Sequence, residues 1–209
     1  MSTIEQILSL ERIDELIFRG DPVESALTRT FGGQVAAQAL VAATETITDK
    51  AVHSLHGYFV APGKADQPTV YLVDPIRDGR SFSSRQVRAI QDGETIFSMQ
   101  ASFHRRGDVG PEHSDLMRDV PDPETLPVDP STMPVSSRAL LEEWGDWDIR
   151  VVPSDRYEHN PYTPSQQVVW FRSKRPLPDD ETLHVCTLAY MSDMTLLHSS
   201  LVPHPGHKV

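Results

Sequence analysis

A run of small and apolar residues, 34–43, constrains the fold of this chain more than any other feature. It consists of Ala, Val and Leu apart from Gln34 and Gln38, and Gly32-Gly33 precede it. A helix that is apolar nearly all round is buried on all sides. Its alanines also let neighbouring structure approach closely. The run therefore predicts a central helix that a sheet surrounds.

Strand-like segments follow this helix. Two pairs, Asp78-Gly79 and Asp92-Gly93, mark turns, because Asp-Gly supplies the positive φ of a two-residue hairpin. The last segment alternates and places Phe97, Met99, Ala101 and Phe103 on one face. A buried helix followed by an antiparallel meander is typical of the hotdog fold, an α+β architecture. The elements predicted around the central helix are a short helix at 3–9 and strands at 13–18, 53–60, 69–77, 80–90 and 94–104.

A region rich in proline and acidic residues, 107–164, follows the meander. It holds nine of the 17 prolines, and this density predicts a linker that lies over the surface. One short helix is expected in it at 138–144, with Ser137 as its N-cap. Strands are then predicted at 148–153 and 167–173, and a second apolar helix at 181–201.

The order of these elements predicts a tandem, or double, hotdog whose second domain is incomplete. The first helix and meander occupy 31–104, so a second copy beginning at Thr182 would extend about 46 residues beyond Val209. We therefore expect an N-terminal hotdog domain at 1–106, the linker at 107–164, and the start of a second hotdog domain at 165–209.

Charge and composition exclude several classes of protein. The net charge of −11 argues against a general nucleic-acid binder, which needs a basic face. The single cysteine, Cys186, excludes an internal disulfide and fits a reducing compartment. No segment approaches the roughly 18 apolar residues of a membrane span, and residues 1–10 lack the features of a signal peptide. We expect a soluble, cytoplasmic protein.

Three stretches of the sequence carry extended motifs. They are FGGQVAAQAL at 31–40; HSLHGYF at 53–59, continued by RDGRSFSSRQVRAIQ at 77–91 and MQASF at 99–103; and VWFR at 169–172 with LAYMSD at 188–193. Together they resemble the acyl-CoA thioesterase II (TesB-like) family. The resemblance implies two tandem hotdog domains that hydrolyse fatty acyl-CoA to a fatty acid and coenzyme A, with no cofactor.

The resemblance also assigns a catalytic role to Asp193. The family uses an Asp on the second hotdog helix, together with a Thr or Ser and a Gln from later strands, which would lie beyond Val209. As a base, Asp193 would deprotonate a water that attacks the thioester carbonyl. The residues alone leave alternatives open, because Asp is unfavourable within a helix. In one alternative the helix breaks at Asp193. In the other the Asp193 side chain faces solvent.

Three further residues are candidates for substrate binding, each with a structural alternative. Gly33 would offer its backbone N–H to a carbonyl oxygen or phosphate, or would let helix and sheet pack closely. His56 would approach the substrate groove, or would be a hydrogen-bonded structural histidine. Arg85 would contact the phosphates of coenzyme A, or would form an ion pair with a nearby Asp. It is one of four arginines near one hairpin, Arg77, Arg80, Arg85 and Arg88.

Other chemistries have less support in the sequence. The histidines lack the Cys or carboxylate spacing of a zinc site, so we predict no metal. Cys186 is expected in the core, and no Gly-x-Ser-x-Gly nucleophile elbow is present. The first helix contains neither His nor Asp, which argues against a hydratase that acts on enoyl-CoA. A catalytically inactive acyl-CoA-binding or interaction module is the alternative from another class.

The predicted architecture also has a consequence for assembly. Hotdog domains commonly pair edge to edge, which covers strand edges that would otherwise be exposed, so we expect a homo-oligomer. Without its remaining sheet, the second domain is expected to leave apolar side chains of its helix partly uncovered, namely Leu188, Leu196 and Leu197.

Overall fold

The computed structural model describes residues 2–25, 27–107, 109–126, 144–163, 165–204 and 206–207. They form two compact units: Met1–Val109 with Pro178–Ser192, and Gly110–Leu177 with Asp193–Val209. The helix expected at 138–144, with Ser137 as its cap, lies outside the described residues except for Trp144. The domain boundaries proposed from the sequence stay predictions.

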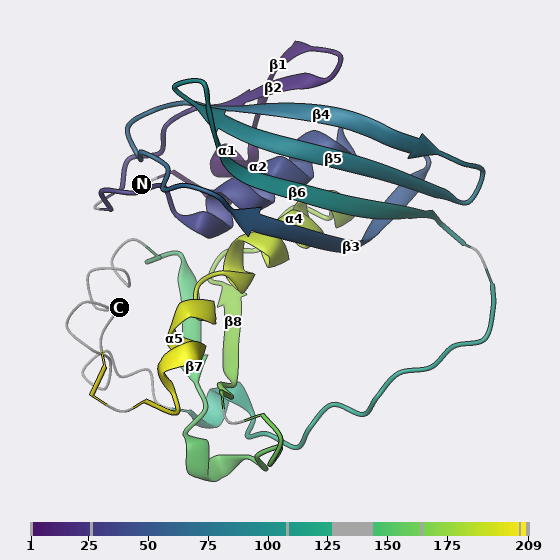
Figure 1. Ribbon diagram of the computed structural model, residues 1–209. Helices are drawn as coiled ribbons and strands as arrows, with labels where there is room; N and C mark the ends of the chain where they lie inside the picture. Colours follow the sequence, from purple (N-terminus) through teal and green to yellow (C-terminus); the bar gives the residue numbers. More distant parts are fainter. Residues whose placement is uncertain are drawn as a thin grey trace. The chain divides into compact units, whose positions relative to one another are not determined.

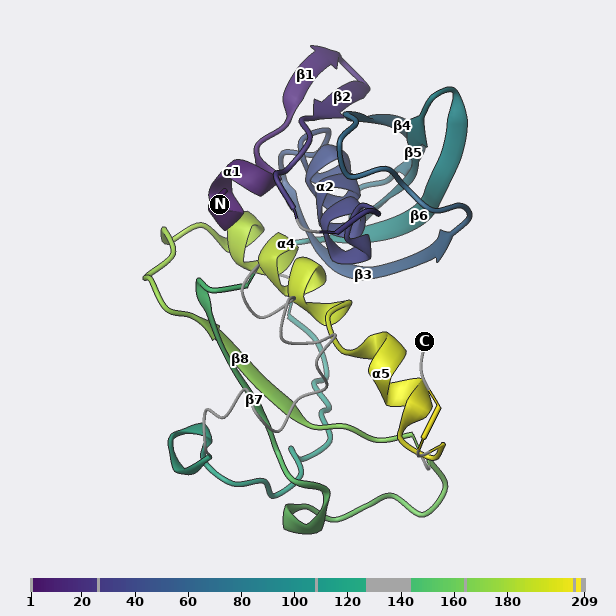
Figure 2. The same ribbon diagram turned by 90° about the vertical axis from the view of Figure 1, so that its left-hand side faces the viewer.

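The first unit is a six-stranded antiparallel sheet wrapped around one helix (Figures 1 and 2). The strand order is β1-β2-β4-β5-β6-β3, so β3 forms one edge. This arrangement confirms the predicted α+β hotdog architecture. Its elements are α1 (Ile4–Leu8), β1 (Glu11–Asp14), β2 (Ile17–Gly20), α2 (Gly32–Thr44), β3 (Lys50–Phe59), β4 (Thr69–Asp78), β5 (Phe82–Gln91), β6 (Glu94–Arg105) and α4 (Glu181–Ser192).

The core of this unit lies between α2 and the concave face of the sheet, with α1 and α4 packed against the other side of α2 (Figure 2). The predicted alternation in β6 is confirmed, since Phe97, Met99, Ala101 and Phe103 are all buried. Burial of each large apolar side chain contributes roughly 1.5–3 kcal/mol. The buried side chains that face each other include Val35, Leu40, Tyr71, Val87, Met99 and Phe103.

Hydrogen bonds explain how the polar side chain of Gln38 fits into the buried helix α2. Its side chain is only 1% exposed. Its Nε2 donates to the carbonyl oxygen of Ile7 (2.5 Å), and the hydroxyl of Tyr71 donates to its Oε1 (2.6 Å). A Cβ at Gly20 would lie 2.6 Å from that Oε1, so the glycine leaves room for the amide. Because every buried polar group in this network has a partner, the glutamine joins α1, α2 and β4.

The two Asp-Gly pairs differ in structure. Asp92-Gly93 forms the predicted turn, with φ of 49° and 82°. The prediction for Asp78-Gly79 is wrong, since neither residue has a positive φ. An irregularity in β4 between Pro75 and Arg77 shifts the register and keeps Asp78 paired with β5. A three-residue loop, 79–81, therefore joins the strands, and the N–H of Gly79 donates to the carbonyl oxygen of Phe82 (2.8 Å).

Two other predicted elements are each split. The strand expected at 13–18 is a hairpin of β1 and β2, because the Asp14 carboxylate accepts the N–H of Glu15 and turns the chain (2.7 Å). The single helix expected at 181–201 is also wrong. It ends at Ser192, a turn covers Asp193–Thr195, and α5 (Leu196–Leu201) follows. Ser and Asp side chains compete with the helical backbone for hydrogen bonds, and the Ser192 hydroxyl donates to the carbonyl oxygen of Ala189 (2.8 Å).

The second unit contains the predicted strands as β7 (Trp147–Val151) and β8 (Val169–Ser173), an antiparallel pair. Two 3-10 turns, Pro123–Thr125 and Ser154–Arg156, lie outside the pair. The Asp148 carboxylate on β7 binds Arg150 (2.9 Å) and Arg172 of β8 (3.0 Å). A small apolar cluster packs in this unit and consists of Val120, Leu126, Val152, Tyr157, Val168 and Trp170.

The expected exposure of three leucines is confirmed. Leu188 of α4 and Leu196 and Leu197 of α5 are each more than half exposed. None of the helices described here has both the length and the apolar character that a membrane span requires.

Candidate active site

The N-terminal end of α2 packs tightly against α4. A Cβ added to Gly33 would lie well under 3.0 Å from the backbone carbonyl oxygen of Tyr190 and 2.5 Å from the Phe31 ring. The rings of Phe31 and Tyr190 also meet edge to face, with centroids 5.0 Å apart. This close approach favours the packing alternative for Gly33, with a helix rather than the sheet as its neighbour. Its role in substrate binding stays a prediction.

Asp193 follows this contact by three residues in the sequence. It begins the turn after α4 and is half-buried. The structure therefore agrees with the alternative in which the helix breaks here, but the side chain is not fully exposed to solvent. The carboxyl end of α4, where a helix concentrates partial negative charge, immediately precedes it. The catalytic role of Asp193 stays a prediction.

A hollow of about 490 Å³ opens beside the N-terminal end of α2. The hydroxyl oxygen of Thr30 is buried at its wall and has no hydrogen-bond partner among the described residues. Gly32 contributes backbone, and Arg29 the cationic group of the lining. The apolar part of the wall consists of Val35, Phe59, Val60, Ala61, Pro62 and Ile96. Such a hollow accepts an apolar chain that ends in a polar group.

Hydrogen bonds to backbone groups hold the wall of the hollow in place. The N–H of Thr30 donates to the carbonyl oxygen of Gly63 (3.0 Å). The side-chain amide of Gln91 accepts the N–H of Lys64 (2.8 Å) and donates to the carbonyl oxygen of the same residue (3.1 Å). Neither Thr30 nor the loop at 60–63 was predicted from the sequence to be functional. The run Val-Ala-Pro-Gly, unusually apolar for an exposed loop, is the signal that could have found it.

Arg85 points into the protein and is engaged there. Its side chain is 4% exposed. Its guanidinium donates to the hydroxyl of Thr46 (2.8 Å) and forms an ion pair with Asp78 (2.9 Å). The Arg85 guanidinium holds the pKa of the Asp78 carboxyl below its ordinary value of 3.8. These contacts favour the ion-pair alternative for Arg85, and its contact with coenzyme A phosphates stays a prediction.

Replacing Asp78 with Asn is expected to lower the free energy of unfolding by about 1 kcal/mol near neutral pH. The loss is modest because the Asp78 side chain is 60% exposed and solvent screens the pair. A lowered pKa in the folded state adds stability above about pH 4, which is lost as the pH falls through the folded value. Urea unfolding from pH ~6 to pH ~2 should show the two proteins converge in stability at acid pH. A difference in the free energy of unfolding that stays constant over this range would contradict the assignment.

Asp74→Asn is the matched control for Asp78→Asn, since Asp74 forms no ion pair in the described part of the chain.

His56 lies on the outer face of edge strand β3. It is exposed, and its ring meets Tyr58 edge to face at 4.8 Å. Within the described residues it forms no hydrogen bond, so the structure does not place it as a hydrogen-bonded structural histidine. The sheet separates its face from α2 (Figure 1). Its role in substrate binding stays a prediction.

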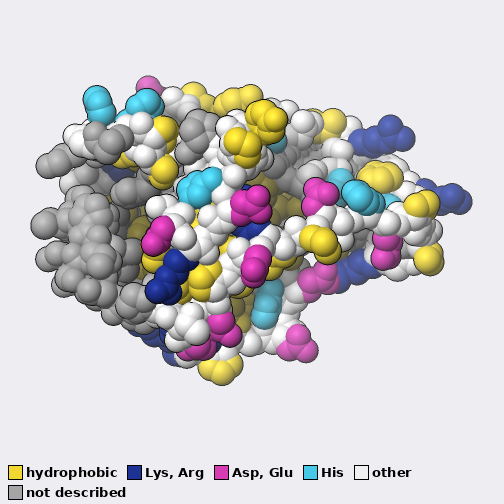
Figure 3. Space-filling model, turned by 90° about the horizontal axis from the view of Figure 1, so that it is seen from below, with side chains coloured by type: hydrophobic (Ala, Val, Ile, Leu, Met, Phe, Trp, Pro, Cys, Tyr) yellow, Lys and Arg dark blue, Asp and Glu magenta, His cyan; other side chains and the backbone are white. Residues whose placement is uncertain are grey.

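Charged side chains of both signs are interspersed on one face of the molecule. On the face drawn in Figure 3, Asp and Glu side chains alternate with Lys, Arg and apolar side chains rather than forming a continuous patch. Together with the net charge of −11, this face offers no broad basic surface to a nucleic acid. Among the described residues, no group of three or more His, Cys, Asp or Glu side chains is arranged to hold a metal ion.

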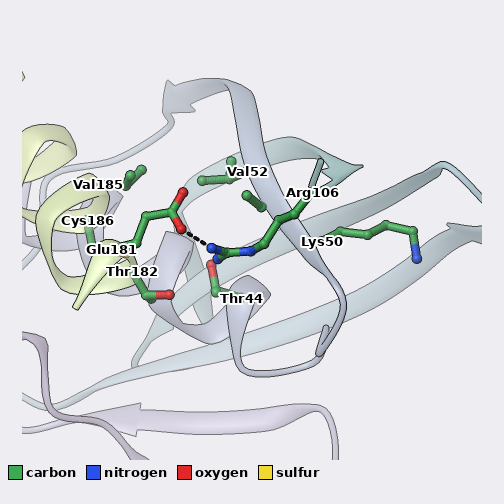
Figure 4. Close-up of a pocket in the computed structure, with 9 residues that line it drawn as sticks. Thr44, Lys50, Val52, Arg106, Glu181, Thr182, Val185 and Cys186 are labelled. Atoms are coloured by element: carbon green, nitrogen blue, oxygen red, sulfur yellow. Dashed lines mark hydrogen bonds and ion pairs between the residues drawn. The ribbon is translucent and has the colours of Figure 1, made fainter. Parts of the chain in front are cut away.

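Cys186 lies in the core, as predicted. It borders a cavity of about 20 Å³ where the start of α4 meets the ends of β3 and β6 (Figure 4). Burial raises the pKa of its thiol to about 12, so it is protonated at neutral pH and unsuited to nucleophilic attack. The nearby ion pair between Arg106 and Glu181 joins the end of β6 to α4.

Comparison with protein families gives two matches along the chain. Residues 22–104 match the family described as "Acyl-CoA thioesterase N-terminal domain". Residues 141–208 match the family described as "Acyl-CoA thioesterase". The first match covers the hotdog helix and meander, and the second covers β7, β8, α4 and α5.

Individual relatives are similar over nearly the whole chain. The chain is 35% identical to acyl-CoA thioesterase 2 of Haemophilus influenzae, covering 98% of this chain and 74% of the relative. It is 34% identical to the human acyl-coenzyme A thioesterase 8, covering 99% and 70%. The crystal structure of the acyl-CoA thioesterase II TesB2 from Mycobacterium marinum is also similar. It has a TM-score of 0.81 and 46% identity, over 97% of this chain and 71% of that one.

Proposed function

Because the chain belongs to the TesB-like acyl-CoA thioesterase family, we propose that it hydrolyses acyl-CoA thioesters to a carboxylic acid and coenzyme A. One observation in the structure carries the proposal. An apolar hollow with an unpaired hydroxyl opens at the glycine-rich end of α2. This hollow suits a thioester, which joins an apolar acyl chain to a polar carbonyl.

In the proposed reaction Asp193 acts as a general base. Its carboxylate accepts a proton from a water molecule, whose oxygen attacks the carbonyl carbon of the thioester. The carbon–sulfur bond then breaks, and the sulfur leaves as the thiolate of coenzyme A. A thiol of pKa about 8.5 is a good leaving group and needs little help from an acid. A half-buried carboxylate after α4 supports this role, because it combines access to water with a fixed position.

The test is release of thiol from acyl-CoA substrates of graded chain length, measured with a thiol reagent. Hydrolysis in water enriched in oxygen-18 should place one label in the carboxylic acid product, because the new oxygen comes from water. Release of coenzyme A without label, or no release above the background rate with any chain length, would contradict the proposal. Saturable acyl-CoA binding without thiol release is the result that the inactive binding module predicts.

The homo-oligomer predicted from the sequence is also part of the proposal. Strand β3 lies at the edge of the sheet, and its apolar side chains Leu55 and Phe59 are exposed. Exposed apolar edges are typical sites of strand pairing, so we propose that two copies pair along β3. Light scattering is expected to give twice the mass of one chain, and Leu55→Lys is expected to shift the protein toward monomer. A monomeric mass at all concentrations would rule this pairing out.

We further propose that the enzyme acts on lipids in the cytoplasm. The resemblance to thioesterases of fatty acyl-CoA supports the lipid substrate, and the single free cysteine supports a reducing compartment such as the cytoplasm. Fractionation of cells followed by detection of the protein tests it, and recovery in a membrane or organelle fraction would oppose it.

A further inference from the structure

A second hollow lies on the outer face of the sheet, at the hairpin between β4 and β5. Its volume is about 520 Å³. Arg77 of β4 and Arg80 of the loop at 79–81 line it, as do Phe82, Ser84 and Ser102. Helix α2 packs on the opposite face (Figure 2). The hollow is therefore distinct from the one at the N-terminal end of α2.

The positive charge of this hollow is not neutralised locally. Asp78 lies between the two arginines in the sequence, but it pairs with the buried Arg85 on the inner face (2.9 Å). In the described part of the chain, neither Arg77 nor Arg80 forms an ion pair with a carboxylate. Two arginines that line one hollow without a carboxylate partner give it a positive charge, in a chain of net charge −11, that favours an anion.

An aromatic surface stands next to these arginines. The Phe82 ring is 49% exposed on a face whose neighbouring side chains are mostly polar. The His104 ring lies 4.5 Å from it and the His53 ring 5.9 Å, measured between centroids. The Nε2 of His53 lies 2.9 Å from the Ser102 hydroxyl oxygen in a hydrogen bond, which fixes that ring at the rim of the hollow.

We propose that this hollow binds a phosphate ester that carries a planar base, the chemistry of a nucleotide. The guanidinium forks of Arg77 and Arg80 match phosphate oxygens with paired charged hydrogen bonds. The hydroxyl of Ser84 supplies a further donor at the floor. The base stacks on the exposed face of Phe82, since every base has a flat face that pairs with an aromatic ring.

Binding of adenosine monophosphate to the full chain, measured by titration calorimetry, tests the proposal. The nucleotide is expected to bind more tightly than inorganic phosphate or adenosine alone. Loss of one guanidinium, in Arg77→Gln or Arg80→Gln, should raise the Kd about tenfold, and loss of both about a hundredfold. Phe82→Ala should raise the Kd for the nucleotide about tenfold and leave that for phosphate unchanged.

A matched control and a fold check keep the test decisive. Arg88 is exposed on the same face of β5 but does not line the hollow, so Arg88→Gln should leave binding unchanged. Circular dichroism of each variant confirms that the sheet is intact. Absence of nucleotide binding overturns the proposal. So does equal binding by the double arginine variant, or equal affinity for phosphate and nucleotide.

Discussion

Replacing Asp193 with Asn is expected to lower kcat for acyl-CoA hydrolysis about a thousandfold, within the 10²–10⁴ range for a lost general base. The amide has nearly the same shape as the carboxylate but cannot accept the proton of the attacking water. The KM should change little, because the variant keeps the hollow beside α2. The rate of thiol release by the purified protein, measured over a range of acyl-CoA concentrations, gives both kcat and KM.

The control for this variant lies just before the start of α4, the helix that Asp193 follows. Asp179 precedes α4, is exposed and forms no interaction in the described part of the chain, so Asp179→Asn should retain the wild-type rate. Unchanged circular dichroism and acyl-CoA binding in the Asp193 variant would separate lost chemistry from lost fold. A wild-type rate in Asp193→Asn would show that another group activates the water.

The helix and the sheet could be predicted because their patterns are local. The apolar run at 34–43 and the alternation through Phe97 and Met99 fix which surfaces are buried, whatever surrounds them. Turns were less predictable. Asp92-Gly93 and Asp78-Gly79 share a dipeptide, but only the first adopts positive φ, because the second lies next to a register shift set by strand pairing.

The site could be predicted only in part, for a related reason. Asp193 drew attention because Asp is unfavourable in the apolar helix that the sequence predicts, and its catalytic role stays a prediction. The hollow depends on the meeting of Thr30 with the loop at 60–63, and a hydrogen bond between residues 33 positions apart has no local pattern. Strand alternation does place Arg85 on the inner face, but its partner Thr46 comes from a distant segment.

Replacing Gly33 with Ala is expected to destabilise the protein by about 3 kcal/mol, the upper range for an overfilled core. The added methyl group would meet the carbonyl oxygen of Tyr190, which is backbone, and a carbon of the Phe31 ring at 2.5 Å. A helix backbone cannot rotate away as a flexible side chain can, so α2 and α4 must separate. Chemical denaturation of wild type and variant measures the difference.

Gly110→Ala is the matched control, because a Cβ at that glycine meets nothing within 4 Å and its φ is not positive. Its stability should stay within about 0.5 kcal/mol of wild type, as for other surface changes. The pair of variants also separates the two roles of Gly33. If Gly33→Ala keeps full stability but loses activity, the glycine serves the substrate. A large loss of stability would mean that it serves the contact between helices.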